Sequence, residues 1–285
     1  MPWHASLDLA LARERGRSVA RFRHDGPLRI LQTLYPEGDA ISHNVLVHPP
    51  GGLVGGDVLD VTVQVAGGAH GLVTTPGATR FYRSAGEFAV QRARIRLETG
   101  ARFEWLPLEA ICHSGCLAEN RLAFDLAEGA EAMGWDITAF GLPESGEPFE
   151  HGSLLQHIEL GTAWLERGRI DAADKPLLDG PLGLAGRRCM GSLFFLAGSA
   201  LARGLERHPR WPCAGGNRGR HVSGAAGHRG ARAVAAGRAG HAAAALRPRC
   251  LAPDAVAARA DAAARVESLT ERRWRTVRMG TRARP

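Results

Sequence analysis

Apolar and polar residues alternate along many short segments between about residues 17 and 170, as in strands that bury one face. The clearest segments are 58–65, 93–97 and 122–126, and glycine or proline separates such segments at short intervals. This pattern predicts an all-β sandwich, barrel or solenoid, because strands do not alternate with helices along the chain. No internal repeat of fixed period is visible, so the sequence does not indicate a regular repeat solenoid.

A different pattern follows this region. Residues 191–207 are apolar on most helical faces and end in Glu and Arg, which predicts a partly buried helix. We therefore expect a mainly β chain with three parts: a β-rich body over 1–186, a helix over 187–206 and an Arg/Ala/Gly-rich tail over 207–285. No apolar stretch is long enough to span a bilayer and no signal peptide is visible, so we expect a cytoplasmic protein.

The tail differs in charge from the rest of the chain, whose total net charge is +7 over 285 residues. Residues 207–285 contain 17 Arg and 4 acidic residues, whereas residues 1–206 contain 19 basic and 25 acidic residues. We favour the interpretation that this tail is frame-slipped or otherwise non-native sequence. A divergent helical end and a nucleic-acid-binding arm are the alternatives, and the arm would have only Trp211 and Trp274 as stacking aromatics.

Cysteine usage suggests reduced thiols, because five cysteines are present and no signal peptide precedes them. Cys112, His113 and Cys116 form a Cys-x3-Cys segment whose internal His adds a third soft or borderline ligand for zinc or nickel. A structural zinc site would need a fourth ligand, for which His151 or His157 is a candidate. The alternative is an ordinary loop with unmodified thiols.

A glycine-rich segment, HPPGGLVGGD at 48–57, is the most distinctive in the chain. It lacks the ending of a phosphate-binding P-loop, and no helix follows it as a dinucleotide site requires. Its glycine pairs allow the backbone to approach a ligand or partner closely, with Asp57 as a carboxylate at the exit. The alternative is a pair of tight turns in which Asp57 accepts turn amides. The glycines are Gly51, Gly52, Gly55 and Gly56.

A second distinctive segment, TTPGATRFYRS at 74–84, turns at Pro-Gly and then presents hydroxyls, arginines and aromatic rings. Arg80 and Arg83 are suited to binding a carboxylate or phosphate. The alternative is an ordinary turn with a solvated basic face.

Several carboxylates lie within predicted strands, where burial is costly unless they are paired or hydrogen-bonded. Two of them could form an acid/base pair of a hydrolase, and a hydrogen-bonded surface or turn role is the alternative for each. These residues are Asp60, Glu104, Glu109, Asp136 and Glu166.

Taken in order along the chain, the distinctive segments closely resemble the UreD family of urease accessory proteins, called UreH in some lineages. The resemblance covers about residues 1–206 and fades beyond them, and the family usually lacks the Cys-x3-Cys segment. It is carried by residues 27–32, 34–38, 48–57, 74–84, 104–107, Trp135-Asp136, Gly141 and 149–152.

The resemblance implies a scaffold rather than an enzyme. Such a protein binds the urease apoprotein and, with UreF and through it the GTPase UreG, delivers nickel to an active site that carries a carbamylated lysine. It also implies a stacked β-sheet, β-helix-like body with a small helical C-terminal part. We expect no tightly bound cofactor, only transient handling of nickel, and neither a membrane nor a nucleic acid as partner.

The resemblance further implies a polar tunnel for nickel, along which weak, repeated oxygen ligands let the cation pass without trapping it. Asp57 is the first candidate for its lining and Asp136 the second. The remaining candidates are Thr79, Glu166 and Asp60. Arg80, Tyr82 and Arg83 are expected to order their turn or to contact a partner. Two competing functions remain, a hydrolase using an Asp57/Asp136 carboxylate pair and a nucleic-acid-binding protein acting through residues 207–285.

Overall fold

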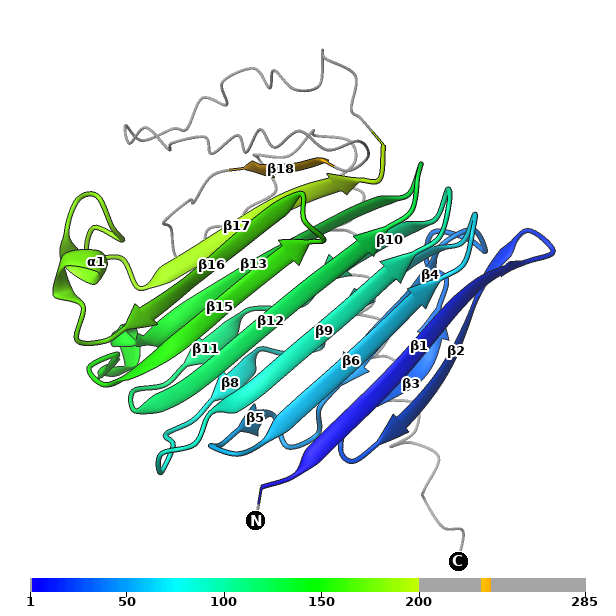
Figure 1. The fold of residues 1–285 in the computed structure, drawn as a ribbon. Helices are drawn as coiled ribbons and strands as arrows, with labels where there is room; N and C mark the ends of the chain where they lie inside the picture. The colour runs from blue at the N-terminus through cyan, green and yellow to red at the C-terminus, as the bar shows by residue number, and fades with distance from the viewer. Residues whose placement is uncertain (1, 200–231, 237–285) are drawn as a thin grey trace, which may run out of the picture.

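Two β-sheets lie face to face and form most of the molecule, as Figure 1 shows for the computed structural model, which describes residues 2–199 and 232–236. The chain runs back and forth between the sheets, so that successive coils stack on one another. The expected mainly β, stacked and β-helix-like body is therefore confirmed.

The first sheet has seven strands in the order β16-β15-β12-β9-β6-β1-β2. The five inner strands pair in parallel, and an antiparallel strand closes each end of the sheet. The bounds are β1 (His4–Glu14), β2 (Arg17–Asp25), β6 (Val58–Val65), β9 (Ala89–Leu97), β12 (Cys116–Leu126), β15 (Gly152–Leu160) and β16 (Trp164–Asp171).

The second sheet follows the order β3-β4-β7-β10-β13-β11-β8-β5, with β14 and β17 also on β13, and β18 on β17. Its bounds are β3 (Arg29–Leu34), β4 (Ser42–Val47), β5 (Gly52–Leu53), β7 (His70–Thr74), β8 (Thr79–Phe81), β10 (Arg102–Leu106), β11 (Ala110–Cys112), β13 (Glu131–Leu142), β14 (Glu147–Pro148), β17 (Cys189–Ala197) and β18 (Arg232–Ala236). A 3-10 turn, η1 (Pro143–Ser145), and one short helix, α1 (Lys175–Asp179), complete the described residues. No helix in these residues is long and apolar enough to cross a membrane.

The coils of the stack differ in length, which explains why no fixed repeat is visible in the sequence. Val58 pairs with Val90, 32 residues later, and Val90 pairs with Glu119 after only 29 residues. Glu119 in turn pairs with Leu155 after 36 residues. Because turns of different length join strands that still stack in register, the backbone repeats although the sequence does not.

The core lies between the two sheets and follows the predicted alternation. In β6 the side chains of Leu59, Val61 and Val63 are buried, whereas Asp60 and Thr62 point to the opposite face. Burying each such aliphatic side chain contributes roughly 1.5–3 kcal/mol. The strands predicted at 58–65, 93–97 and 122–126 are confirmed, the last two as parts of the longer strands β9 and β12.

The helix predicted over 187–206 is wrong over residues 189–197, which form β17 instead. A run that is apolar on most faces has no period that separates a buried helix from a buried strand. Here β17 pairs antiparallel with the central strand β13 and buries Phe194 and Leu196. Residues 200–206 lie outside the described residues. So does the tail from 207 onward apart from 232–236, and the interpretations of the tail therefore stay predictions.

Candidate functional site

Asp136 lies on β13 and points into the space between the sheets, where polar groups surround its carboxylate. Asn120 donates its Nδ2–H to Oδ2 at 2.6 Å, and Thr138 donates its hydroxyl to Oδ1 at 3.4 Å. Burial raises the pKa of Asp136 from an ordinary 3.8 to about 6, although hydrogen bonds from Gln156, Asn120 and Thr138 act in the opposite direction. Nearby Glu166 raises this pKa further.

Three side-chain amides from neighbouring strands form a row beside Asp136. Asn120 is paired in register with Gln91 on one side and Gln156 on the other. Gln91 donates to Asn120 Oδ1, and Asn120 donates to Gln156 Oε1, each over 3.5 Å. Sequence reasoning missed this row. Its signal was a polar residue at an inward position of an alternating strand, such as Asn120 among the buried Ala118 and Leu122.

The remaining members of this group come from β16 and β17. Ser192 is paired with Asp136 in register and donates its hydroxyl to Glu166 Oε1 at 3.3 Å. Asp136, Glu166 and Ser192 keep partial solvent exposure, so the group is not sealed inside the protein. We call it the inter-sheet cluster, consisting of Gln91, Asn120, Asp136, Thr138, Gln156, Glu166 and Ser192.

Thr79 belongs to a row that reaches the same cluster. The register places Thr79 beside Ala110, and Ala110 beside Thr138, so all three lie on one face of the second sheet. Of the predicted tunnel residues, the structure therefore brings together Asp136, Glu166 and Thr79.

Asp57 and Asp60 lie elsewhere. Asp57 is buried, and its two oxygens accept the backbone N–H groups of Trp3 at 3.3 Å and Val54 at 2.9 Å, so it holds the glycine-rich turns together. Asp60 is on the outer face of the first sheet, where its carboxylate is 2.7 Å from His4 Nε2 and 3.6 Å from Arg92 Nη1. Neither residue joins the inter-sheet cluster, and this arrangement does not support an Asp57/Asp136 acid/base pair.

The two distinctive sequence segments pack directly on each other. A Cβ atom at Gly52 would overlap the ring of Tyr82, and one at Gly55 would overlap the side chain of Ser84. Gly52 also pairs with Arg80 across β5 and β8. The glycines are therefore required for the close approach of these two turns.

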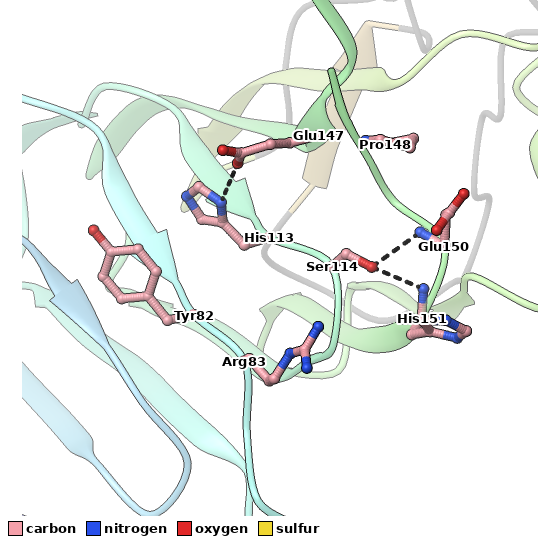
Figure 2. Close-up of a pocket in the computed structure, with 8 residues that line it drawn as sticks. All are labelled: Tyr82, Arg83, His113, Ser114, Glu147, Pro148, Glu150 and His151. Carbon is pink, nitrogen blue, oxygen red and sulfur yellow. Dashed lines mark hydrogen bonds and ion pairs between the residues drawn. The ribbon is translucent and has the colours of Figure 1, made fainter. Parts of the chain in front are cut away.

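A cavity of about 580 Å³ opens beside these turns, where three segments distant in sequence meet (Figure 2). The ring of Tyr82 stacks on that of His113 at 5.0 Å, and His113 Nδ1 lies 3.4 Å from a Glu147 carboxylate oxygen. Ser114 Oγ accepts the backbone N–H groups of Glu150 and His151. The cavity is lined by Tyr82, Arg83, His113, Ser114, Glu147, Pro148, Glu150 and His151.

The Cys-x3-Cys segment does not form the predicted ligand set. His113 lines the cavity, whereas Cys112 and Cys116 are fully buried in the core. Across residues 2–199 and 232–236, no three His, Cys, Asp or Glu side chains are arranged to hold a metal ion together. Its side chains thus divide between two environments, and the structure gives them no shared ligand.

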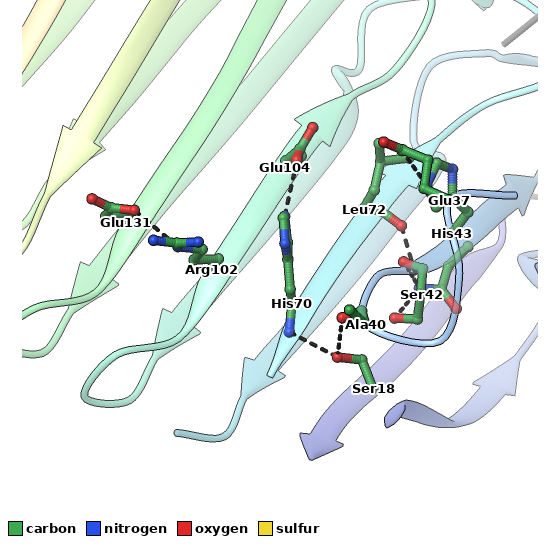
Figure 3. Close-up of polar contacts among 11 residues, drawn as sticks. Ser18, Glu37, Ala40, Ser42, His43, His70, Leu72, Arg102, Glu104 and Glu131 are labelled. Carbon is green, nitrogen blue, oxygen red and sulfur yellow. Dashed lines mark hydrogen bonds and ion pairs between the residues drawn. The ribbon is translucent and has the colours of Figure 1, made fainter. Parts of the chain in front are cut away.

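Two imidazole–carboxylate pairs lie near each other on β4, β7 and β10, as Figure 3 shows. His43 Nε2 is 2.9 Å from Glu37 Oε1, and His70 Nε2 is 2.9 Å from Glu104 Oε1. Burial lowers the pKa of His43, and the charge of Glu37 offsets part of this effect. Because each imidazole already has a carboxylate partner, these pairs fasten the loop that carries Glu37 to the sheet.

Comparison with known proteins gives consistent matches. A family model described as "UreD urease accessory protein" matches residues 4–284, and so extends beyond the expected 1–206. The urease accessory protein UreD of Variovorax paradoxus (strain S110) is 68% identical over 203 residues, which cover 71% of this chain and 74% of that protein. The UreD protein of Polaromonas naphthalenivorans (strain CJ2) is 67% identical with the same coverage. That of Methylibium petroleiphilum (strain ATCC BAA-1232 / LMG 22953 / PM1) is 51% identical over 221 residues, which cover 71% of this chain and 75% of that protein.

Proposed function

The chain belongs to the UreD family of urease accessory proteins, and we propose that it is a scaffold for assembly of the urease nickel centre. It is an accessory protein and not an enzyme. In this proposal it binds the urease apoprotein and, together with UreF and UreG, supports nickel delivery and maturation of the active site. Nickel is then a cargo that the chain handles transiently, in the cytoplasm.

The inter-sheet cluster is the single observation that carries the nickel part of this proposal. A protein core normally satisfies its polar groups with few partners, whereas here seven polar side chains converge between two otherwise apolar sheets. Asp136 and Glu166 supply carboxylate oxygens, and the amides and hydroxyls around them supply neutral oxygens. Such a row suits a cation that must move on.

The pKa of Asp136 gives this row a suitable charge. With a pKa of about 6, Asp136 is mostly ionised at neutral pH, and its buried charge lacks a cationic partner among its contacts. A passing divalent cation would supply that partner. The absence of a three-ligand group in the described residues also suits transit, because a complete ligand set would hold the metal.

The nickel role is tested by comparing Asp136→Ala with Asp60→Ala, a carboxylate removed from the outer face of the same body. Each full-length variant is co-expressed with cognate urease, UreF and UreG, and nickel is counted per purified urease active site. We expect Asp136→Ala to lower nickel loading while the complex is still captured by affinity tag, and Asp60→Ala to leave loading unchanged. Equal nickel loading in both variants would exclude a role of the cluster in transport.

The scaffold role is tested separately by a pull-down of the tagged full-length chain and of residues 1–206, each expressed with the urease subunits and UreF. Capture of both partners by the full-length chain supports the complete proposal. Capture of urease but not UreF by both proteins would confine the working region to the β body. Capture of neither partner by the full-length chain would contradict the scaffold proposal.

A further inference from the structure

Cys112 and Cys116 form a pair of adjacent thiols inside the β body. Both residues are fully buried, and neither takes part in a disulfide. The register places Cys112 between Phe81 and Phe140, two core residues, so its side chain faces the interior. The Cys112 thiol donates a hydrogen bond to the sulfur of Cys116, which puts the two sulfur atoms in contact.

The backbone between them is a tight turn that keeps the sulfurs together. The N–H group of Cys116 donates to the carbonyl oxygen of His113 at 3.1 Å. Cys112 is the last residue of β11 and Cys116 the first of β12, so both ends of the turn are fixed by strands. Disulfides need closely approached side chains on a backbone that does not have to move far, and this turn meets that need.

The two thiols differ in acidity, as in an exchange-active pair. Hydrogen bonding to Cys116 and burial raise the pKa of Cys112 well above the ordinary thiol range. The hydrogen bond from Cys112 lowers the pKa of Cys116, which burial alone would raise. Cys116 is therefore the better nucleophile, and Cys112 supplies the second thiol.

Metal binding does not account for this pair, because no third His, Cys, Asp or Glu within the described ranges completes a ligand group with it. The neighbouring charge of Asp136 raises the pKa of Cys112, which disfavours the second thiolate that a soft metal would need. The chemistry left to two contacting thiols is oxidation to a disulfide.

We propose that Cys112 and Cys116 are a redox-sensitive dithiol that closes to a disulfide when a small disulfide such as oxidised glutathione is present. The Cys116 thiolate attacks one sulfur of the oxidant and releases one reduced thiol. Cys112 then loses its proton and attacks Cys116 in this mixed disulfide, which releases the second thiol. The pair is oxidised by two electrons and the oxidant is reduced by two, so the exchange balances.

The disulfide would act on two places described above. It would fix the turn that carries His113 and Ser114, which are both in the wall of the cavity in Figure 2. It would also fix the start of β12, the strand that holds Asn120 against Asp136. The proposal does not depend on nickel transport, because the dithiol chemistry follows from the turn and the thiol contact alone.

The test uses the full-length chain, equilibrated in mixtures of reduced and oxidised glutathione, quenched in acid and alkylated. Intact mass then counts oxidised thiols, and peptide mapping identifies them. We expect a single reversible transition that links Cys112 to Cys116. Cys189 of β17 is the internal control, and it should stay alkylatable through the transition.

Two variants separate the roles of the thiols. In Cys112→Ser, Cys116 should be trapped as the glutathione mixed disulfide. In Cys116→Ser, Cys112 should react at least about tenfold more slowly, because its thiolate is disfavoured. The proposal is overturned if both thiols stay alkylatable in the folded wild-type chain at every glutathione ratio, or if the disulfide found involves Cys189 instead. Circular dichroism on each variant confirms that it is folded.

Discussion

Replacing Asp136 by Asn should stabilise the protein at neutral pH and much less in acid. The substitution keeps the size of the side chain and its ability to accept from Asn120 and Thr138. It removes a carboxylate whose ionisation is disfavoured by burial. A residue kept at a cost to stability is a frequent property of functional sites.

The magnitude follows from the two pKa values of Asp136, about 6 when folded and 3.8 in its ordinary state. Because the folded value is raised, the stability contributed by the neutral acid is fully present below pH 3.8 and is lost as the pH rises through about 6. Each pKa unit corresponds to about 1.4 kcal/mol. The advantage of the Asn variant should therefore grow from about 1 kcal/mol near pH ~4.5 to at most about 3 kcal/mol near pH ~7.5.

The assay is urea unfolding of the wild-type chain and the variant at these two pH values, with the free energies of unfolding compared at each. Asp60→Asn is the control, because it removes a carboxylate from the outer face together with its pairs to His4 and Arg92. That variant should lose under about 1 kcal/mol, the usual range for exposed ion pairs. If the difference between Asp136→Asn and wild type is the same at both pH values, the argument from burial is refuted.

Three further predictions use other parts of the structure. Asp57→Ala should lower the free energy of unfolding by about 1–3 kcal/mol in chemical denaturation, because two buried backbone N–H groups lose their acceptor; an unchanged midpoint would contradict the staple. Gly152→Ala should lower the melting temperature strongly, because its Cβ would overlap the backbone of Cys116, whereas Gly146→Ala, with open space and a similarly positive φ, should cost only about 1 kcal/mol; equal losses would show that crowding is not the cause. Nickel added near neutral pH should raise the melting temperature of the wild-type chain and not of Asp136→Ala, and an equal rise in both would place the bound metal outside the cluster.

The alternating pattern predicted the β body well, because a strand with one buried face reveals its period in the sequence. In β6 the same period already places Asp60 opposite Leu59 and Val61, and therefore outside the core. The tunnel residues were taken from motifs and resemblance, which carry no facing information. For this reason Asp60 was grouped with Asp136 although the two lie on opposite faces of the first sheet's core side.

Two other features could not be predicted from the sequence for physical reasons. The run that forms β17 has no distinguishing period, and only pairing with β13 decides its conformation. The contact between Asn120 and Asp136 joins strands of different sheets, so it depends on how the sheets face each other. The inward amides Gln91, Asn120 and Gln156 were detectable one by one, as polar interruptions of apolar faces, but their alignment needed the register.

The stacked coils also fix how the polar row is spaced. Gln91, Asn120 and Gln156 occupy equivalent places on neighbouring parallel strands, which in any sheet lie about 4.8 Å apart. The step between successive polar groups is thus a property of the backbone and does not change when a side chain is replaced. Gaining or losing one whole coil would lengthen or shorten the row by a single step while leaving every other step intact. The row can therefore change its reach in evolution without being rebuilt.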